Sequence, residues 1–255
     1  MVQVRRVVTT RAGGRSTGPF ARFNLSAGVG DDPAAVAANR RRLAAELGVR
    51  GVVFLDQVHG TQVAVVDAVP RPGDPDRPGS DAAVTALPGV ALAVLSADCV
   101  PVLLADPRAE VVGVAHAGRV GAAAGVLPRT LEAMTALGAH VGDCEALLGP
   151  AVCGACYEVP AAMRDEVEAT LPGSASRTRS GTPGLDLRAG LRAQLAALGV
   201  GRVGVDPRCT VEDPDLYSHR RATGRGGPGR TGRLAAVTWL DASRRPAGHP
   251  LRASP

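Results

Sequence analysis

Three polar residues stand where apolar segments of the sequence give way to turns, and their types suit a metal ion. His59 follows FLDQV, Cys99 follows VLSAD, and His116 follows VVGVA. The ends of strands are common places for functional groups in α/β proteins. Two imidazoles and a thiolate are good ligands for a first-row metal, and zinc is the plainest choice. Three protein ligands leave a fourth position open, as in catalytic zinc sites.

The same three residues allow other interpretations. A lone buried cysteine is usually a small apolar residue, and a lone histidine near a strand end usually forms only a hydrogen bond. The separations between the three match no compact zinc signature. Cys99 could also be a nucleophile, with His59 or His116 as its base. From spacing alone, a metal site and a cysteine nucleophile both stay open.

Further residues are candidates for contacts around these three. Gln57 comes two residues before His59 and could point to the same side of a strand. Asp81, in GSDAAVT, is a turn residue or a ribose or base contact, and Asp98 orients a ligand or caps a turn. Phosphate prefers arginine forks and backbone N–H groups. The candidates for that role are Arg22, Arg119, Arg220, Arg221 and the main chain around Asn24 to Gly30.

The remaining cysteines give a weaker signal. The chain has five cysteines, and this odd number excludes a full disulfide framework. Cys153 and Cys156 form a C-x-x-C motif, but nothing around it resembles a thioredoxin unit. The sequence has no second C-x-x-C that would complete a zinc ribbon. We interpret these two residues as structural thiols.

Apolar and β-rich segments predict the strands that position the candidate residues. The apolar run 90–105 indicates two buried strands, because Pro101 would break a single helix. The other expected strands cover 2–9, 51–55, 62–66, 111–116, 145–148, 202–205 and 234–240.

Helical spacing of apolar residues predicts a helix over 33–47, with Asp32 as its cap and Gly48 at its end. Further helices are expected at about 121–137, 160–171 and 185–198. Strands and helices mix without strict alternation. This order predicts a single α+β domain over 1–255, a layered α/β sandwich with mixed β-sheets flanked by helices. Its core would cover about 2–241, with a flexible tail over 242–255.

The composition narrows the classes of function. The 29 basic residues are all arginine, so lysine Schiff bases and P-loop lysines are excluded. A net charge of +5 favours anions such as phosphate, while 2% aromatic residues argue against a stacking platform for single-stranded nucleic acid. No apolar run reaches the roughly 20 residues of a membrane span. We expect a cytoplasmic protein with neither membrane nor nucleic acid as partner.

Eight strings occur in order over roughly residues 18–240 and carry a family resemblance. They are FNLSAGVGDD, NRRRLAAELGV, LDQVHGTQV, GSDAAVT, SADCVPVLLAD, GVAHAGRVG, LGPAVCGACYEV and LYSHRRATGRGGPGR. Together they resemble the bacterial purine nucleoside phosphorylase family, formerly classed as polyphenol oxidoreductase, or laccase-domain, proteins. The order QVHG, ADC-x-P and HAG, with CYEV downstream, is specific, whereas any one string alone is weak.

The resemblance implies a site and an activity. It implies a zinc ion held by His59, Cys99 and His116, with copper as another metal. The implied reaction is phosphorolysis of adenosine, inosine and methylthioadenosine, with accessory deamination of adenosine. The implied partners are purine nucleosides and phosphate, and the implied assembly is a monomer or a small homo-oligomer.

Two departures from the family pattern bear on substrate preference. The family usually has HAGWRG where this chain has HAGRVG, so Arg119 replaces a tryptophan and Val120 an arginine. Near the C-terminus, His219 replaces an aromatic residue and Ala222 an acid in SHRRATG. Either change could alter or abolish activity.

Three other functions compete with the phosphorylase. One is a metal-free cysteine hydrolase that uses Cys99. Another is a copper-dependent polyphenol oxidoreductase, which five histidines serve poorly. The last is a basic protein that binds RNA through the Gly/Arg-rich segment 217–233.

Overall fold

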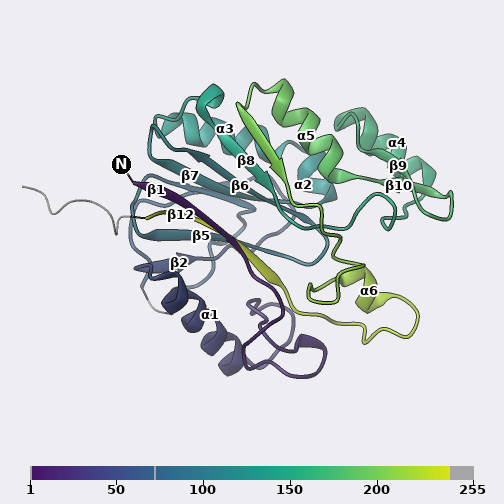
Figure 1. Ribbon diagram of the computed structural model, residues 1–255, viewed down its shortest axis with the longest axis horizontal. Helices are drawn as coiled ribbons and strands as arrows, with labels where there is room; N and C mark the ends of the chain where they lie inside the picture. Colours follow the sequence, from purple (N-terminus) through teal and green to yellow (C-terminus); the bar gives the residue numbers. More distant parts are fainter. Residues whose placement is uncertain (1, 72, 242–255) are drawn as a thin grey trace, which may run out of the picture.

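The computed structural model describes residues 2–71 and 73–241, and its centre is formed by strands that are buried on both faces. These strands are β5 (Val90–Ser96), β6 (Val100–Asp106) and β7 (Val111–Ala117). Each is a continuous apolar run, which is typical of a strand with both faces covered. They belong to two sheets that pack face to face, with helices outside each sheet (Figure 1).

The first sheet has the order β1-β12-β5-β2. Strand β12 pairs antiparallel with both β1 and β5, and β2 pairs parallel with β5. The sheet is therefore mixed, and its first and last strands along the chain are neighbours. Besides β5, its strands are β1 (Gln3–Val8), β2 (Gly51–Val53) and β12 (Leu234–Asp241).

The second sheet has the order β11-β8-β6-β7-β4-β3. Its central pairs are antiparallel, and its two outer pairs are parallel. Besides β6 and β7, its strands are β3 (Val63–Val65), β4 (Ala82–Thr85), β8 (Glu145–Leu148) and β11 (Arg202–Val205). A separate antiparallel pair consists of β9 (Ala175–Arg177) and β10 (Pro183–Leu185).

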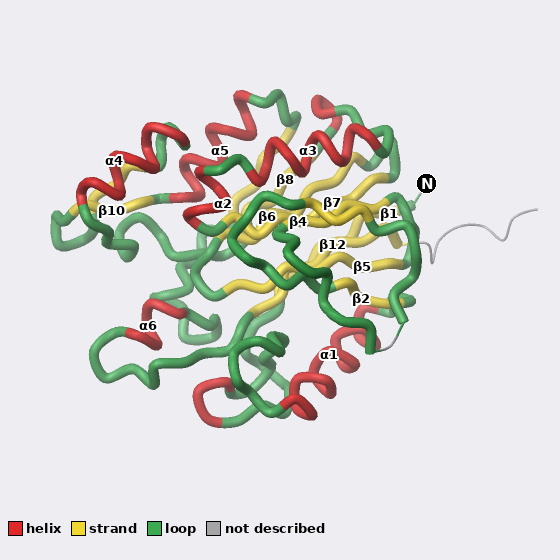
Figure 2. The backbone as a smooth tube through the Cα atoms, turned by 180° about the vertical axis from the view of Figure 1, so that it is seen from behind, coloured by secondary structure: helices red, strands yellow, loops and turns green. Residues whose placement is uncertain are grey.

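The helices cover the outer faces of the two sheets (Figure 2). On the first sheet lies α1 (Pro33–Leu47), which the Asp32 carboxylate caps and Gly48 ends at φ 64°. On the second sheet lie α2 (Arg119–Ala123), α3 (Val126–Ala136) and α5 (Leu187–Ala197), whereas α4 (Ala161–Thr170) packs on the pair β9–β10. The short helix α6 (His219–Thr223) lies apart from both groups, and 3₁₀ turns occupy Gly18–Phe20 and Val141–Asp143.

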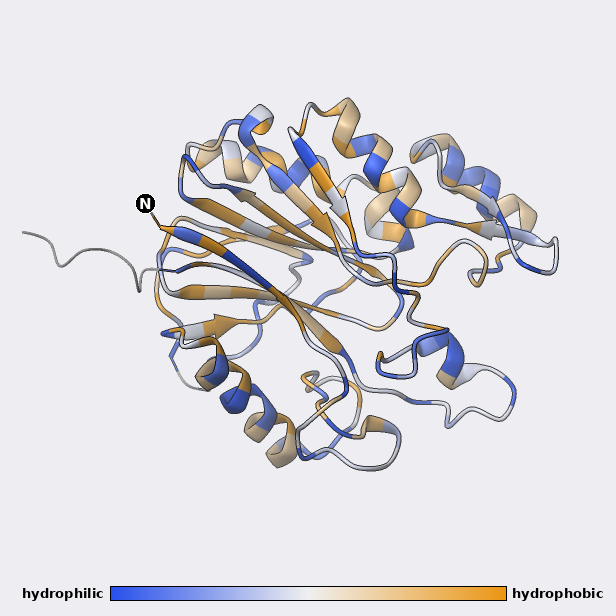
Figure 3. Ribbon diagram, in the orientation of Figure 1, coloured by the Kyte–Doolittle hydropathy of each residue, from blue (hydrophilic) through white to orange (hydrophobic). Residues whose placement is uncertain are grey.

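Alternation along the strands divides the core into layers. Leu92 and Val94 of β5 face the second sheet, whereas Ala91 and Ala93 face α1. Likewise Leu103 faces the first sheet, and its neighbours on β6 face the helices. The strands are accordingly mostly apolar in Figure 3, while α1 alternates between polar and apolar residues. Among the described residues, no helix is long and apolar enough to cross a membrane.

The predicted layered α+β fold with mixed sheets is confirmed, as are α1 and the break between β5 and β6. The expected helix over 121–137 is instead two helices, because Gly125 adopts φ 89° between them. The expected strand over 51–55 ends at Val53. The prediction missed β4, β9, β10 and α6. The expected tail over 242–255 lies outside the described residues.

Candidate functional site

The fold brings His59, Cys99 and His116 together where the start of β6 meets the end of β7 in the second sheet. Cys99 lies in the turn between β5 and β6, and His116 lies near the end of β7. Strands β6 and β7 are antiparallel, and Pro101 pairs with His116, so the end of β7 meets the start of β6. His59 reaches the same point from the loop after β2. The three donor atoms lie within 4.8 Å of one another, with His59 Nε2 3.9 Å from Cys99 Sγ.

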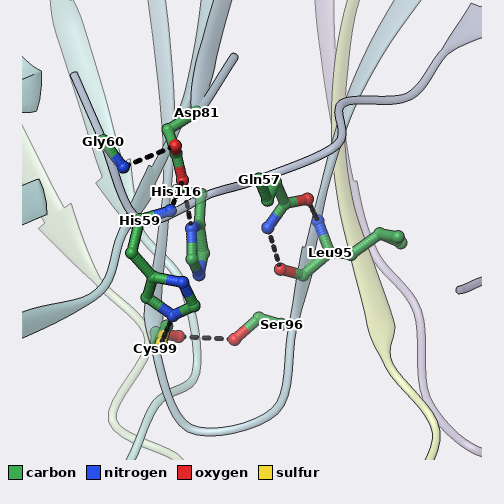
Figure 4. Close-up of polar contacts among 8 residues, drawn as sticks. All are labelled: Gln57, His59, Gly60, Asp81, Leu95, Ser96, Cys99 and His116. Carbon is green, nitrogen blue, oxygen red and sulfur yellow. Dashed lines mark hydrogen bonds and ion pairs between the residues drawn. The ribbon is translucent and has the colours of Figure 1, made fainter. Parts of the chain in front are cut away.

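A buried carboxylate contacts the ring of His116 and the backbone of His59 (Figure 4). Asp81, just before β4, has its Oδ1 2.8 Å from His116 Nδ1. Its carboxylate also accepts the backbone N–H groups of His59, at 3.0 Å, and Gly60, at 2.7 Å. With Nδ1 engaged by Asp81, His116 keeps Nε2 for a ligand. A metal-binding histidine commonly has such a carboxylate on its second nitrogen.

The loop that carries His59 is held in an uncommon backbone conformation. Gln57 and His59 both have positive φ, at 58° and 62°. The side-chain amide of Gln57 donates to the carbonyl of Leu95 on β5 and accepts the N–H of the same residue, each at 2.7 Å (Figure 4). Positive φ is uncommon for residues other than glycine, so these contacts hold a strained loop. The placement of Gln57 and His59 on one side of a strand was wrong, because both lie in this loop.

Charges within the site stabilise one another. Burial would raise the pKa of the Cys99 thiol, but hydrogen bonds with His116 and His59 outweigh it and lower that pKa to about 6. Burial would lower the pKa of His116, but Asp81 and Cys99 raise it to about 9. Burial also opposes ionisation of Asp81, yet His116 and the N–H of Gly60 bring its pKa below the usual range. The site therefore favours a thiolate, which is the form that binds metals.

The donor set fits a metal ion with an open position. One thiolate and two imidazole nitrogens converge, and one of the imidazoles is already oriented by a carboxylate. The set matches three-ligand zinc sites in the type and number of donors. The positions of the three donor atoms, as well as their types, therefore support metal binding at this site.

The three residues line a pocket of about 880 Å³, within the usual range for small-molecule sites. Its walls carry three arginines, Arg119, Arg220 and Arg233, and the phenol of Tyr157. The Arg220 guanidinium lies over the Tyr157 ring at 4.9 Å. Burial raises the pKa of Tyr157, as does the charge of Cys99, while Arg119 and Arg220 oppose that rise. The pocket therefore combines a metal-type donor cluster with several cations and a neutral phenol.

The structure separates the other sequence candidates into two groups. Gln57, Asp98, Arg119 and Arg220 line the pocket. Asn24, Asp81 and Arg221 lie behind it and hold protein groups. The Asn24 amide donates to Asp31 and Ser26, and Asn24 Oδ1 accepts the N–H groups of Ser26 and Arg233. The Arg221 guanidinium donates to four backbone carbonyls, those of Thr210, Val211, Asp213 and Leu216.

Asp98 acts on the protein rather than on a metal ligand. Its carboxylate accepts the Thr210 hydroxyl and the backbone N–H of Arg220, both at 2.6 Å. It thereby joins the turn that carries Cys99 to α6. Asp98 therefore positions a wall of the pocket.

Tyr157 and Arg233 are two charged or polar residues of the pocket that the sequence prediction did not assign to the site. Tyr157 lies in the CYEV string of the family resemblance, and this string could have indicated it. No motif in the sequence indicates Arg233. Burial lowers the pKa of Arg233, which donates to the carbonyls of Thr231 and Gly232. With Arg220, Arg221 and Arg233 turned inward, the segment 217–233 offers few of its arginines as a surface for RNA.

Comparison with known proteins places this architecture in a family. Residues 5–241 match the family model described as multi-copper polyphenol oxidoreductase laccase, and the chain belongs to this family. It is 57% identical over 242 residues to a purine nucleoside phosphorylase of Mycobacterium tuberculosis, covering 94% of this chain and 93% of the relative. It is 54% identical over 235 residues to a purine nucleoside phosphorylase of Streptomyces griseus, covering 91% and 93%.

Solved structures show the same fold. Neisseria meningitidis protein NMB0706 matches with a TM-score of 0.82 and 38% identity, over 93% of this chain and 94% of that one. The Bacillus licheniformis hypothetical protein YfiH matches with a TM-score of 0.85 and 30% identity, over 94% and 93%. The architecture is therefore that of the family throughout the described chain.

Proposed function

We propose that this chain is a zinc-dependent purine nucleoside phosphorylase. Its substrates would be adenosine, inosine and methylthioadenosine, and its products the free base and ribose 1-phosphate or methylthioribose 1-phosphate. The observation that carries the proposal is the convergence of His59, Cys99 and His116 in a pocket lined by arginines. The names of the relatives in Mycobacterium and Streptomyces support the same reaction.

The reaction defines what the pocket must do. In phosphorolysis the bond between C1′ and the purine nitrogen breaks, a phosphate oxygen bonds to C1′, and the leaving base takes up a proton. Phosphate must therefore be held next to the sugar, and the charge that develops on the purine must be stabilised. A pocket with separate cationic and metal-type groups meets both requirements.

The chain's own residues provide the phosphate-binding groups. Arg119 and Arg220 present guanidinium groups to the pocket, and Tyr157 stacks against Arg220. Arginine forks suit phosphate because their planar N–H groups match its oxygens. Here Arg119 stands where the family usually has tryptophan, so it adds a cation at this wall. The neutral Tyr157 phenol is available to donate a hydrogen bond.

The residues for the metal are His59, Cys99 and His116, with Asp81 orienting the His116 ring and holding the His59 backbone. A zinc ion held there would supply a Lewis acid beside the bound nucleoside. Copper-based phenol oxidation is less well served, because a multi-copper cluster needs many more imidazoles than five histidines provide. We also propose accessory deamination of adenosine, in which water replaces the amino group and ammonia leaves.

A metal-free cysteine hydrolase is the second candidate. It is favoured by the low pKa of Cys99, which together with His116 and His59 forms a thiolate next to imidazole groups. This function and the phosphorylase differ in two requirements. The hydrolase works without metal and without phosphate, whereas the phosphorylase needs both.

The test is incubation of the purified protein with inosine, with and without phosphate, while hypoxanthine and ribose 1-phosphate are measured. We expect phosphate-dependent release that is lost in a chelated sample and in His59→Ala. His140→Ala is the matched control, because His140 is exposed and lies away from the pocket. Adenosine is assayed for both adenine and ammonia.

Three outcomes contradict the proposal. Absence of turnover with inosine, adenosine and methylthioadenosine alike would exclude the phosphorylase. Full activity of the metal-depleted protein, with covalent labelling of Cys99 by substrate, would establish the hydrolase. Oxygen uptake with phenols and copper would establish the oxidoreductase.

A further inference from the structure

Three of the five cysteines meet at a second place, outside the pocket that holds Cys99. Cys153, Cys156 and Cys209 lie there with Glu212, and their sulfur and carboxylate oxygen atoms are all within 4.8 Å of one another. Cys209 is buried, Cys153 and Cys156 are half-buried, and Glu212 is exposed. The C-x-x-C motif, which lacked a partner in the sequence, thus finds one in C-x-x-E of a distant segment.

The two segments form matching turns. In the first turn the N–H groups of Cys156 and Tyr157 donate to the carbonyl of Cys153, at 2.9 and 3.0 Å. In the second, the N–H groups of Glu212 and Asp213 donate to the carbonyl of Cys209, at 3.2 and 2.9 Å. Each turn therefore directs its first and fourth side chains to the same side. This is how a short C-x-x-C segment presents two ligands to one metal ion.

Backbone contacts hold the two turns together. Ala151 and Cys209 form a parallel bridge, and the N–H of Thr210 donates to the carbonyl of Ala151 at 3.2 Å. The N–H of Cys153 donates to Cys209 Sγ at 3.4 Å. An N–H donor of this kind stabilises a negatively charged sulfur. The site is therefore in place before any ion arrives.

The fourth donor is also oriented. Glu212 Oε1 lies 3.4 Å from Cys156 Sγ. The same carboxylate forms an ion pair with Arg179, from the loop between β9 and β10. Both contacts use Oε1, so the second oxygen of the carboxylate is left for an ion. Arg179 then acts as the outer contact that fixes the ligand.

We propose that Cys153, Cys156, Cys209 and Glu212 bind a second zinc ion, with a structural role. Three sulfurs and one carboxylate oxygen complete a tetrahedral set with no open position, which is typical of structural zinc. Soft thiolates select zinc over calcium or magnesium. None of its four residues lines the pocket that holds Cys99.

The second site is linked to the first through one wall of the pocket. Tyr157 directly follows Cys156 and lines the pocket under Arg220. Thr210 directly follows Cys209 and donates to Asp98, the neighbour of Cys99. An ion that joins the two turns would therefore fix the spacing between Tyr157 and the Cys99 turn. Its loss should loosen the wall and leave His59, Cys99 and His116 in place.

The test separates the two sites by removing the first. The double variant His59→Ala, Cys99→Ser is purified under reducing conditions, and its zinc content is measured by mass spectrometry of the metal. We expect about one zinc ion per chain to remain, as four protein ligands require. Adding Cys209→Ser should abolish this binding, whereas adding Cys144→Ala should not, because Cys144 is a buried cysteine outside the cluster.

A second measurement does not depend on variants that fold poorly. Titration of the metal-depleted wild-type protein with Co²⁺ should give an intense thiolate charge-transfer band from the three-sulfur site, which Glu212→Gln weakens but does not abolish. The proposal is overturned if the double variant binds no zinc and no Co²⁺. It is also overturned if Cys153, Cys156 or Cys209 is found in a disulfide in the reduced preparation. Both readouts are independent of any nucleoside turnover.

Discussion

The carboxylate of Asp81 and the ring of His116 form a buried pair, with 2.8 Å between Oδ1 and Nδ1 and side-chain exposures of 0% and 4%. The pair exists because Ala82 of β4 lies opposite Ala115 of β7, so the residues just beyond them meet. The same carboxylate holds the N–H groups of His59 and Gly60. One acid therefore orients the ring of His116 and holds the backbone of His59.

Asp81→Asn should lower the affinity for zinc by roughly 10- to 100-fold while the chain still folds. The asparagine oxygen can replace Oδ1, but its NH₂ group would face the N–H of Gly60, and two donors cannot pair. Competition with a chelating dye measures the affinity. Asp67→Asn, on an exposed residue, is the control. Equal zinc affinity in the Asp81 variant and the wild type would show that the carboxylate does not orient the ligands.

Gly118→Ala should disrupt the candidate centre through contact alone. A Cβ at Gly118 would lie 2.7 Å from the His59 ring and 3.1 Å from Cys99 Sγ, both closer than normal packing permits. The backbone of Gly118 is at φ −71°, which alanine adopts readily. We expect weaker metal binding and lower phosphorolysis with little change in the unfolding midpoint. Gly142→Ala is the matched control, since nothing lies within 4 Å of its Cβ. Unchanged metal binding in the Gly118 variant would contradict the site geometry.

In metal-depleted protein, Cys99 should react with iodoacetamide as a thiolate down to about pH 6. Burial acts against this, but hydrogen bonds with His116 and His59 lower the pKa from 9.0 to about 6. Alkylation of the Cys99 peptide, followed by mass spectrometry across pH, measures the midpoint. In His116→Ala the midpoint should rise. A wild-type midpoint near that of a free thiol, about 8.5, would mean that the imidazole groups do not stabilise the thiolate.

Arg220→Gln should raise the KM for phosphate by roughly 10- to 100-fold and change the KM for inosine little. Loss of a charge-assisted hydrogen bond costs about 1.5–3 kcal/mol, which corresponds to this range. Arg225→Gln is the control, because Arg225 is exposed on the same segment. Steady-state kinetics with phosphate as the varied substrate decides the question. Equal phosphate KM values in Arg220→Gln and Arg225→Gln would assign the anion to another arginine.

Asp106 should make stability depend on acid pH. Burial raises its pKa, but the N–H groups of His140, Ala109 and Arg108 outweigh burial and bring the pKa below the ordinary value of an aspartic acid. A lowered pKa stabilises the fold fully above the unfolded value of about 3.9 and less as pH falls below it.

Asp106→Asn should therefore lower the free energy of unfolding at pH 7 by about 1–3 kcal/mol, so that the variant unfolds at a lower urea concentration. The difference from the wild type should shrink as the pH falls below about 4. Urea unfolding at a series of pH values measures both effects. A gap that is constant across pH would mean that the charge of Asp106 plays no part.

The sequence predicted the candidate centre better than its surroundings, for a physical reason. His59, Cys99 and His116 each follow an apolar segment. Such segments form strands that end at the same side of a sheet, so the local pattern could predict that the three residues lie close together. Arg221 was assigned to phosphate because its type suits an anion, and the main chain at Asn24 because it could supply N–H groups. In the structure the Arg221 guanidinium binds backbone carbonyls 5 to 11 residues before it, and Asn24 Oδ1 accepts the N–H of Arg233. The pairing of Asn24 with a residue so far along the chain leaves no local signal.

The same limit explains the missed elements. Strand β4 is short and reads AAVT, and only its neighbours β3 and β7 make it a strand. Helix α6 lies in a Gly/Arg-rich segment with little helical pattern, and the Ser218 side chain caps it. The second cysteine cluster joins Cys153 to Cys209 across a large part of the chain. The spacing of cysteines in the sequence could indicate only Cys153 and Cys156.

The position of β12 has a consequence for the order of folding. This strand lies between β1 and β5, yet it is the last of the described strands to leave the ribosome. Until it is made, β1 has no partner in the sheet and β5 exposes an unpaired edge, which invites association with other chains. Completion of the first sheet therefore has to wait for β12. Chains that end before Leu234 should be retained by chaperones or degraded rather than accumulate as folded fragments.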